Sequence, residues 1–289
     1  MPYQNFNIPG QLAIIPGHGE LPKIRVETPW SSAEIYLHGA HVTHFQKKAE
    51  APLLFLSAAS DYSNGKPIRG GVPIIFPWFG GREGLPAHGF ARTVTWELVE
   101  TAALADGAIR IRLSLPTIAF FEAEFIITVG ESLEMEFLVR NSGKQETSFE
   151  TCLHTYFQIS RIEEISISGL HGSSCTDKLL DRHFTEGPAP LQVSSEVERV
   201  YNNSTATVEI ADPGFQRIIR VAKSGSASTV VWNPWIAKSL RLPDIGNEEY
   251  LHMLCVESGN IGTDSIHLPP GGLAAMKVTL SSHPNPTHP

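Results

Sequence analysis

The stretch Phe125-Ile-Ile-Thr-Val-Gly-Glu-Ser-Leu-Glu-Met-Glu-Phe-Leu-Val-Arg140 holds two of the short, alternating apolar runs that dominate this chain. Successive side chains of a β-strand point to opposite faces, so such runs predict strands with one buried face. No long stretch has a convincing helical period. The candidate strands cover residues 24–27, 33–37, 42–45, 109–115, 125–129, 133–140, 147–154, 165–168, 205–210, 218–221, 228–232, 253–257 and 274–280.

Turn signals rich in glycine and proline separate these runs. Many short strands punctuated in this way predict an all-β protein, an antiparallel β-sandwich with few short helices. No linker-like change of composition divides the chain, so we expect one domain over residues 1–289 with a frayed tail at 281–289. The turn signals are Asp106-Gly107, Asn141-Ser-Gly143, Asp212-Pro-Gly214 and Pro269-Pro-Gly-Gly272.

Composition and charge limit the classes of function. Of the 289 residues, 42% are hydrophobic and 18% are charged, a balance typical of a soluble globular protein. The formal net charge of −8 argues against nucleic acid or an anionic membrane as the main partner. An anionic small ligand stays compatible with this charge, because a few clustered arginines set the local field.

Three further features predict a cytoplasmic protein. Residues 1–10 contain no basic region followed by an apolar run, so we expect no signal peptide. No run approaches the roughly 18 uninterrupted apolar residues of a membrane span. The three cysteines, Cys152, Cys175 and Cys255, fit reduced thiols better than a disulfide framework. We also expect a monomer.

The segment Arg69-Gly-Gly-Val-Pro-Ile-Ile-Phe-Pro-Trp-Phe-Gly-Gly-Arg-Glu-Gly-Leu-Pro-Ala-His-Gly-Phe-Ala-Arg92 is the most informative part of the chain. Proline and glycine interrupt it too often for an ordinary helix. Its aromatic and aliphatic residues are too many for an exposed loop. A buried, glycine-rich segment with an arginine at each end predicts a cleft where backbone and guanidinium groups meet an anionic ligand.

Two other sites carry ionisable groups in strongly β-prone surroundings. His154 ends one apolar run, and Glu257 ends another just before a Ser-Gly-Asn turn. A carboxylate on a buried strand is costly unless it has a partner or a use. Residues two apart in a strand share a face, so Cys152 should share a face with His154, and Cys255 with Glu257. Taken alone, each group is more often structural than catalytic, and spacing alone leaves the function open.

The histidine-rich run His38-Gly-Ala-His41-Val-Thr-His44 invites a metal-site interpretation. Strand positions three apart face opposite sides, so these three side chains cannot meet at one ion without a bend. No carboxylate lies within the run. We therefore predict a strand, a bend and a second strand with surface histidines, and no metal site.

Taken together, several motifs in order resemble the aldose 1-epimerase superfamily, most closely its hexose-6-phosphate mutarotase branch, the glucose-6-phosphate 1-epimerases. They run from about Val26 to the Pro-Pro-Gly-Gly turn and cover most of the chain. The matching motifs are Arg69-Gly-Gly-Val-Pro, Phe76-Pro-Trp-Phe-Gly80, Leu85-Pro-Ala-His-Gly-Phe-Ala-Arg92, His154-Thr-Tyr-Phe157, Glu198-Arg-Val-Tyr201, Val231-Trp-Asn-Pro-Trp235 and Cys255-Val-Glu257.

The resemblance implies a galactose-mutarotase-like β-sandwich (a supersandwich) with an open cleft on one concave sheet. It implies His154 as the general acid and Glu257 as the general base. It also implies that Arg69 and Arg92 bind the phosphate of the substrate. His88 would bind or orient the sugar in the cleft.

Some positions depart from the family pattern. Glu198 falls where the family usually has an aspartate, so its carboxylate would accept a sugar hydroxyl from one methylene further out. Ala87 falls where some members carry a ligand-contacting glutamine, and we transfer no contact to it. The region after Trp235 departs from a lysine-rich pattern, so we transfer no substrate role to Lys238 or Arg241.

The resemblance therefore predicts an isomerase that interconverts the anomers of hexose 6-phosphates, glucose 6-phosphate first, and that needs no cofactor. An imidazole and a carboxylate on opposite sides of the C1–O5 unit could open the sugar ring. Three alternatives stay open. The chain could act on unphosphorylated aldoses, it could bind sugar phosphates without turnover, or it could use Cys152 or Cys255 as a nucleophile beside His154.

Overall fold

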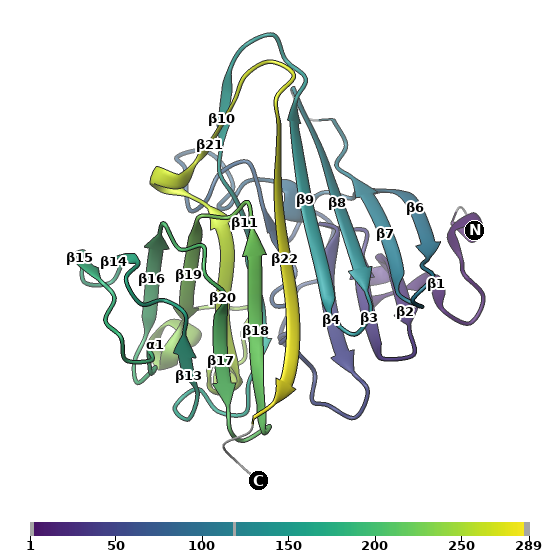
Figure 1. Ribbon diagram of the computed structural model, residues 1–289. Coiled ribbons are helices and arrows are strands. Elements are labelled where there is room, and N and C mark those ends of the chain that lie inside the picture. The colour runs from purple at the N-terminus through teal and green to yellow at the C-terminus, as the bar shows by residue number, and fades with distance from the viewer. Residues whose placement is uncertain (1–2, 118–119, 286–289) are drawn as a thin grey trace.

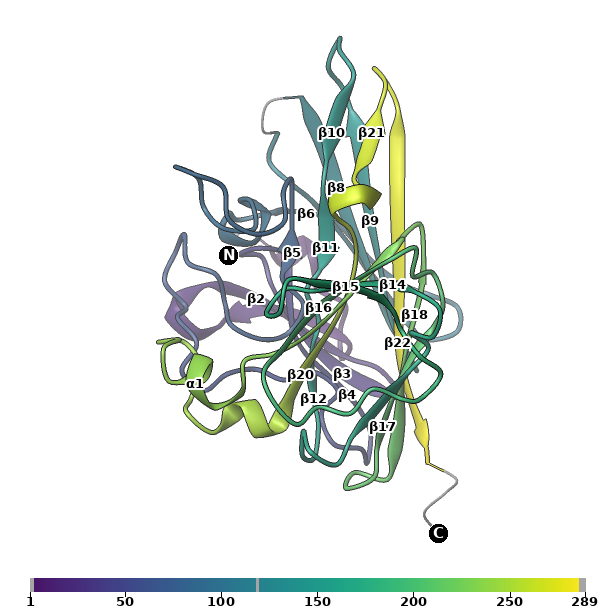
Figure 2. The ribbon, with the colours of Figure 1, turned by 90° about the vertical axis from the view of Figure 1, so that its left-hand side faces the viewer.

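The computed structural model describes residues 3–117 and 120–285. Two large antiparallel sheets lie one behind the other (Figures 1 and 2). The sheet in front in Figure 1, here called the outer sheet, has the order β13-β17-β18-β22-β9-β8-β7-β6. Its strands are β6 (Glu97–Ala103), β7 (Ile109–Ser114), β8 (Phe121–Val129), β9 (Leu133–Asn141), β13 (Ser166–Ser168), β17 (Val208–Asp212), β18 (Arg217–Ser224) and β22 (Leu273–Pro284).

The outer sheet follows the alternation that the sequence predicts. Along β8 every second side chain is buried, from Phe121 to Val129, and the intervening ones are more exposed. In β9 the buried positions include Met135 and Phe137, while Glu134 and Glu136 face outward. One face therefore packs on the core and the other meets water. The predicted antiparallel β-sandwich is confirmed.

The second large sheet, here called the cleft sheet, has the order β15-β14-β16-β19-β20-β11-β5, and β12 also pairs with β20. Its two central strands, β19 and β20, are buried at every position. Side chains on both faces of this part of the sheet are therefore shielded from bulk water. The strands are β5 (Ile74–Ile75), β11 (Thr151–Leu153), β12 (Tyr156–Gln158), β14 (Ser174–Asp177), β15 (Arg182–Thr185), β16 (Val197–Asn202), β19 (Ser228–Asn233) and β20 (Met253–Asn260).

The remaining elements are small. A four-stranded sheet holds β1 (Leu12–Pro16), β2 (Pro22–Glu27), β3 (Ser31–Tyr36) and β4 (His41–Lys47), and β10 (Thr147–Phe149) pairs with β21 (Ile266–Leu268). The one α-helix in the described part of the chain is α1 (Trp235–Ser239). Short 3-10 helices are η1 (Gln4–Phe6), η2 (His18–Glu20), η3 (Ala91–Thr93), η4 (Glu249–His252) and η5 (Gly262–Asp264). Within the described ranges no helix is long and apolar enough to cross a membrane.

Three predicted boundaries were wrong. The run at 147–154 is two strands, β10 and β11, because Glu150 interrupts it. Strand β20 continues through Ser258 to Asn260, where we expected a turn, because β11 and β19 pair with it there. Residues 281–284, expected to be frayed, extend β22 by pairing with β18. The end of the expected tail, residues 286–289, lies outside the described residues.

The prediction of surface histidines was also wrong for two of the three. His38 and His41 are fully buried. Each places its Nε2 at 2.7 Å from a backbone carbonyl, that of Lys66 for His38 and that of Gly70 for His41. Burial lowers the pKa of His41 to about 3, so the ring is neutral and donates this hydrogen bond. These histidines hold the chain that leads into the cleft.

Candidate active site

The segment 69–92 is fixed to the core by one aromatic side chain. The ring of Phe76 makes edge contacts with Phe90, Phe121, Phe137 and Phe149 at centroid distances of 5.1–6.2 Å. Each such pair contributes about 0.5–1.5 kcal/mol beyond the burial of its surface. The prediction of a buried segment is confirmed for Phe76 and its two isoleucine neighbours, which are fully buried, but it is wrong for residues 81–87, which are exposed.

Two glycines in the segment are required by close backbone approach. Gly71 has φ +59° and lies against the carbonyl oxygen of Val42. Gly89 has φ +70° and lies against the carbonyl oxygen of Phe76. A Cβ at either position would overlap these oxygens, and the positive φ would strain any other residue. The segment can therefore fold back on itself beside the cleft sheet.

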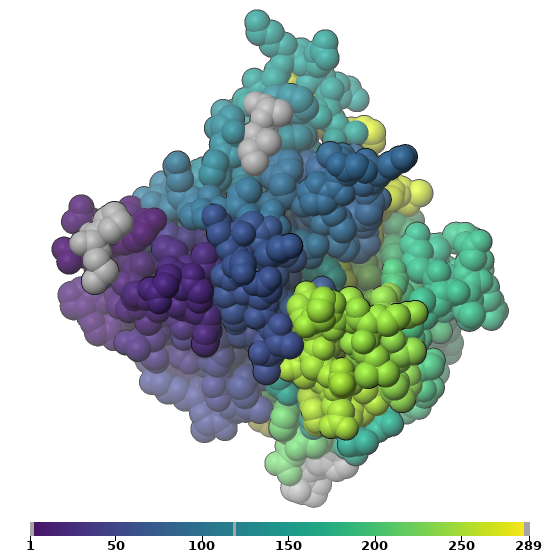
Figure 3. All heavy atoms as spheres, turned by 180° about the vertical axis from the view of Figure 1, so that it is seen from behind, coloured from purple at the N-terminus to yellow at the C-terminus, as the bar shows by residue number. Residues whose placement is uncertain are grey.

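A cleft of about 350 Å³ opens between this segment and the cleft sheet. Figure 3 shows the molecule from behind, where segment 69–92, the region around α1 and the region after β14 surround a hollow. The cleft is lined by the charged residues Arg69, Lys178, Glu198, Lys238 and Glu257, by His88 and His154, by Gly80 and Gly81, and by Phe79, Val200, Val230, Trp232 and Leu242.

His154 and Glu257 meet directly in this cleft. Nε2 of His154 lies 3.2 Å from Oε1 of Glu257, and the two residues are only 8% and 1% exposed. His154 lies between β11 and β12, which both pair with β20, and Glu257 lies in β20. Sheet pairing therefore joins groups that are about a hundred residues apart in the sequence.

Burial shifts the pKa values of both members of this pair. It raises the pKa of Glu257 well above its ordinary value, and it lowers the pKa of His154 well below its own. The nearby His88, Arg92 and Arg69 lower the pKa of His154 further. Both shifts favour a neutral carboxyl group beside a neutral imidazole. The two groups share one proton across a hydrogen-bond distance and titrate as a coupled pair.

Two buried cysteines flank Glu257. The Cys152 thiol donates a hydrogen bond to Oε2 of Glu257 at 3.5 Å. Burial, and then the charge of Glu257, raises the pKa of both Cys152 and Cys255 well above the ordinary value. Both therefore stay protonated, which argues against a nucleophilic thiolate. In the described part of the chain, His154, Cys255 and Glu257 are the one trio that could share a metal ion, with ligand atoms within 4.8 Å of one another.

His88 lines the cleft in a defined tautomer. Its Nδ1 accepts a hydrogen bond from the backbone N–H of Gly80 at 3.3 Å, so the ring proton sits on Nε2. Burial, helped by the charges of Arg92 and Arg69, lowers the pKa of His88 to about 3. Its ring lies 5.9 Å from that of His154. His88 can therefore offer a neutral N–H donor next to the candidate catalytic pair.

Arg69 lines the cleft with its guanidinium group already engaged. Its Nε and Nη2 donate to Oδ2 of Asp244 at 3.1 and 2.9 Å, and its Nη1 donates to the Tyr156 hydroxyl at 2.9 Å. Tyr156 and Asp244 help keep the pKa of Arg69 above its ordinary value. The Tyr156 ring stacks on the ring of His154 at 4.8 Å. Arg69 thus supports the histidine through one intermediate side chain.

Arg92 does not line the cleft. Its Nη2 donates to the carbonyl oxygen of Ala87 at 3.0 Å, and burial lowers its pKa to about 10. Its charge still acts on His88 and Glu257, because it helps to lower the pKa of each. The structure therefore places Arg92 behind the lining of the cleft, as a source of positive potential.

Glu198 lines the cleft as part of an ion pair. Its Oε2 lies 2.8 Å from Nζ of Lys238, which also lies 3.3 Å from Glu196. Lys178, an exposed residue at the end of β14, also lines the cleft and has no ion pair within the described ranges. Sequence reasoning missed Lys178, Tyr156 and Asp244. A single lysine after a strand carries no distinguishing signal, whereas Tyr156 lay within a motif that we had already singled out.

Comparisons with known proteins identify the family of this chain. A model of the aldose 1-epimerase family matches residues 22–281. Two relatives named "Putative glucose-6-phosphate 1-epimerase" are similar over most of their length. The one from Cenchrus ciliaris is 33% identical over 88% of this chain and 82% of that protein, and the one from Escherichia coli K12 is 34% identical over 83% of each.

Solved structures of similar proteins have the same fold as this chain. A protein from Salmonella typhimurium, described as "a putative mutarotase", superposes with a TM-score of 0.89 at 26% identity, over 96% of this chain and 95% of that one. A Synechocystis protein shares the fold with a TM-score of 0.75 at 20% identity, over 96% of this chain and 99% of that one. With the family model matched over most of its length, the chain belongs to the aldose 1-epimerase family of isomerases.

Proposed function

We propose that this protein interconverts the α and β anomers of hexose 6-phosphates, with glucose 6-phosphate as the first substrate to test. The observation that carries the proposal is the 3.2 Å contact between His154 and Glu257 in a cleft that is also lined by Arg69, Lys178 and Lys238. The pair supplies proton transfer, and the cations supply attraction for a phosphate. The relatives named glucose-6-phosphate 1-epimerase support the same substrate.

The reaction moves two protons and breaks one bond. Glu257, as the base, takes the proton from the C1 hydroxyl, while His154, as the acid, gives a proton to the ring oxygen O5. The C1–O5 bond breaks and C1 becomes an aldehyde. After rotation about C1–C2 the same steps run in reverse and close the ring on the other face. General acid and base catalysis typically contribute about 10²–10⁴-fold.

The direct contact changes one expectation. We expected His154 and Glu257 on opposite sides of the C1–O5 unit, but they are neighbours. Two neighbouring side chains can still transfer both protons of ring opening, because the oxygens O1 and O5 are bonded to the same carbon, C1. A proton that passes from Glu257 to His154 produces the carboxylate and imidazolium that ring opening needs. Sugar hydroxyls that donate to Glu257 and a phosphate dianion in the cleft both favour this charged form.

Phosphate selection would come from positive charge around the cleft. A phosphate monoester carries about −1.5 to −2 charges near neutral pH. Arg69 and Lys238 offer donors but already face carboxylates, so they attract an anion less than free cations do. Lys178, with no ion pair in the described part of the chain, and Arg92, behind the lining, would supply the uncompensated charge.

One observation favours a second candidate, an aldose 1-epimerase for unphosphorylated sugars. Arg69, which the family resemblance assigns to phosphate, donates to Asp244 through two of its nitrogens. If this ion pair persists with substrate bound, the cleft has less positive charge to offer a phosphate. The same His154–Glu257 pair would then open the ring of free glucose or galactose.

Exchange spectroscopy by NMR tests both candidates. The rate of exchange between the α and β anomers is measured for glucose 6-phosphate, glucose and galactose, with and without the protein. We expect strong acceleration for the phosphate and weaker acceleration for the free sugars. Acceleration of the free sugars alone would favour the second candidate. Calorimetric binding of glucose 6-phosphate without any acceleration would instead identify a non-catalytic sugar-phosphate-binding protein.

A further inference from the structure

The two carboxylate oxygens of Glu257 have different partners. Oε1 faces Nε2 of His154 at 3.2 Å, and Oε2 accepts a hydrogen bond from the thiol of Cys152 at 3.5 Å. Among the described residues, the side chain of Glu257 has no other hydrogen bond and no lysine or arginine within ion-pair distance. In the described structure the thiol is thus the one side-chain donor to Oε2, the oxygen turned away from the histidine.

The local backbone makes room for this contact. Cys152 in β11 pairs with Gly259 in β20, and a Cβ at Gly259 would come within 2.9 Å of the Cys152 sulfur. Glycine at this position therefore lets the thiol lie across β20. Glu257 is two residues from Gly259 on the same strand, and residues two apart share a face. The cysteine reaches the carboxylate diagonally across the strand pair.

We propose that Cys152 is a positioning residue for the anomerisation, acting through Glu257. Its S–H···Oε2 bond orients the carboxylate so that Oε1 faces His154. A thiol is a weak donor, so it orients the group while leaving it basic. A stronger donor at the same place would bind the carboxylate charge more tightly and make Glu257 a weaker base. The inference rests on the proposed function, because it assumes that Glu257 takes the substrate proton.

Other groups act on Glu257 as well. The titratable or charged groups that face it from other elements are Cys152, His154, Tyr156, Glu198 and Arg92, and Cys255 lies on its own strand. A pH profile of the wild type alone would report all of them together. Differences between variants at Cys152, which leave the other groups in place, isolate the contribution of the thiol.

The test compares Cys152→Ser and Cys152→Ala with the wild type and with Cys175→Ala. Cys175 is a buried cysteine of β14 that makes no contact with Glu257, so its variant controls for the loss of a buried thiol. The rate of anomer exchange of glucose 6-phosphate is measured by NMR across pH. The pair must hold a single proton, with Glu257 ionised and His154 protonated in the reactive form, so the acid limb of kcat/KM follows the coupled titration of His154 and Glu257. We expect this limb to move down by about one pH unit in Cys152→Ser and up by about one in Cys152→Ala.

KM should change less than kcat, because Cys152 does not line the cleft. At a pH on the acid limb, Cys152→Ala should lose about tenfold in rate, and serine should restore it. Cys175→Ala should follow the wild type. Profiles that coincide for the wild type and both Cys152 variants would overturn the proposal. Loss of activity in both variants at every pH would also overturn it and would favour a chemical role for the thiol.

A spectroscopic measurement keeps the test independent of turnover. At a pH where Glu257 is ionised, the infrared S–H stretch of Cys152, identified by subtracting the spectrum of Cys152→Ala, should lie lower than that of a free thiol. It should move upward in Glu257→Gln, because an amide oxygen accepts more weakly than a carboxylate. A band that does not respond to Glu257→Gln overturns the contact. If the wild type accelerates no sugar, the proposed function fails, and with it any positioning role for Cys152, whatever this band does.

Discussion

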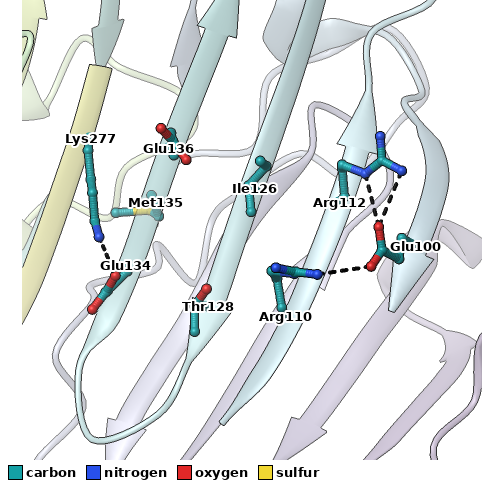
Figure 4. A pocket seen from close by; sticks show the side chains of 9 residues that line it. All are labelled: Glu100, Arg110, Arg112, Ile126, Thr128, Glu134, Met135, Glu136 and Lys277. Atoms are coloured by element: carbon teal, nitrogen blue, oxygen red, sulfur yellow. Dashed lines mark hydrogen bonds and ion pairs between the residues drawn. The ribbon is translucent and has the colours of Figure 1, made fainter. Parts of the chain in front are cut away.

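Two hollows of similar size lie on the two large sheets, and they differ in how their charges are satisfied. The outer-sheet groove, about 330 Å³, is lined by Glu100, Arg110, Arg112, Ile126, Thr128, Glu134, Met135, Glu136 and Lys277 (Figure 4). Its ion pairs join Lys277 to Glu134 at 2.6 Å, and Arg110 and Arg112 to Glu100 at 3.1 and 3.2 Å. The cleft, about 350 Å³, instead contains Glu257, 1% exposed and without a cationic partner among the described residues.

The difference shows that volume alone does not identify an active site. In the groove, opposite charges meet in water, where each pair contributes little and no group is left reactive. In the cleft, the carboxyl group of Glu257 is buried beside the neutral imidazole of His154. This burial lowers the stability of the folded protein, but it leaves both groups able to exchange protons. Variants in the outer-sheet groove and in the cleft can therefore test whether the two hollows differ in function.

The largest effect should follow from replacing Glu257, the proposed base. Glu257→Gln keeps the shape of the side chain but cannot take a proton, so the exchange rate of glucose 6-phosphate should fall by about 10²–10⁴-fold. Glu134→Gln in the groove should leave the rate unchanged. NMR exchange measures both, with circular dichroism to verify folding. Equal rates for the two variants would remove the functional contrast between the hollows.

Glu257→Gln should also stabilise the folded protein. The folded pKa of Glu257 lies well above its ordinary value of 4.5, so its bound proton favours the folded state at low pH, and this contribution is lost as pH rises through the folded pKa. Glutamine carries no charge. Glu257→Gln should therefore gain stability relative to the wild type as pH rises from about 5 to 8, by about 1–3 kcal/mol. Urea unfolding at several pH values measures it, and a loss of stability at pH 8 would contradict it.

The proposed preference for phosphorylated sugars should depend on Lys178, the lysine of the cleft that has no ion pair among the described residues. Lys178→Ala should raise KM for glucose 6-phosphate about tenfold, a free-energy change of about 1.4 kcal/mol, and leave KM for free glucose unchanged. Lys277→Ala, which removes a paired lysine from the groove, is the matched control and should change neither. An equal rise for both sugars after Lys178→Ala would mean that the lysine serves the sugar ring or the fold instead.

The smallest effect should come from the groove itself. Glu134→Gln breaks the ion pair with Lys277, whose partners are 39% and 46% exposed, so the free energy of unfolding should change by less than about 1 kcal/mol. The change should shrink further in high salt, because exposed charges are screened. Thermal unfolding at low and high ionic strength measures this. A larger, salt-resistant loss would show that the groove is more than a solvated sheet face.

Much of the fold could be predicted from the sequence, because strands depend on local patterns of apolar and polar residues. Alternation along β8 and β9 predicted strands with one buried face, and both are present. Eight strands were not predicted, namely β1, β5, β6, β12, β14, β15, β16 and β21. For β5 and β12 the reason is length, since two or three residues carry no period of their own. The burial of His38 and His41 was missed because their partners are backbone carbonyls of a distant loop.

For the candidate site, the sequence by itself determined which residues could do the chemistry. Through the family resemblance of its motifs it implied His154 and Glu257 as acid and base and segment 69–92 as a substrate-binding wall, because residue type and motif order are local properties. Only the tertiary structure decided how they combine. Sheet pairing brought the histidine and the carboxylate into contact, Asp244 took up the guanidinium of Arg69, and burial shifted the pKa values. These outcomes depend on which strands become neighbours and on how much water they exclude, and neither is encoded at any single position.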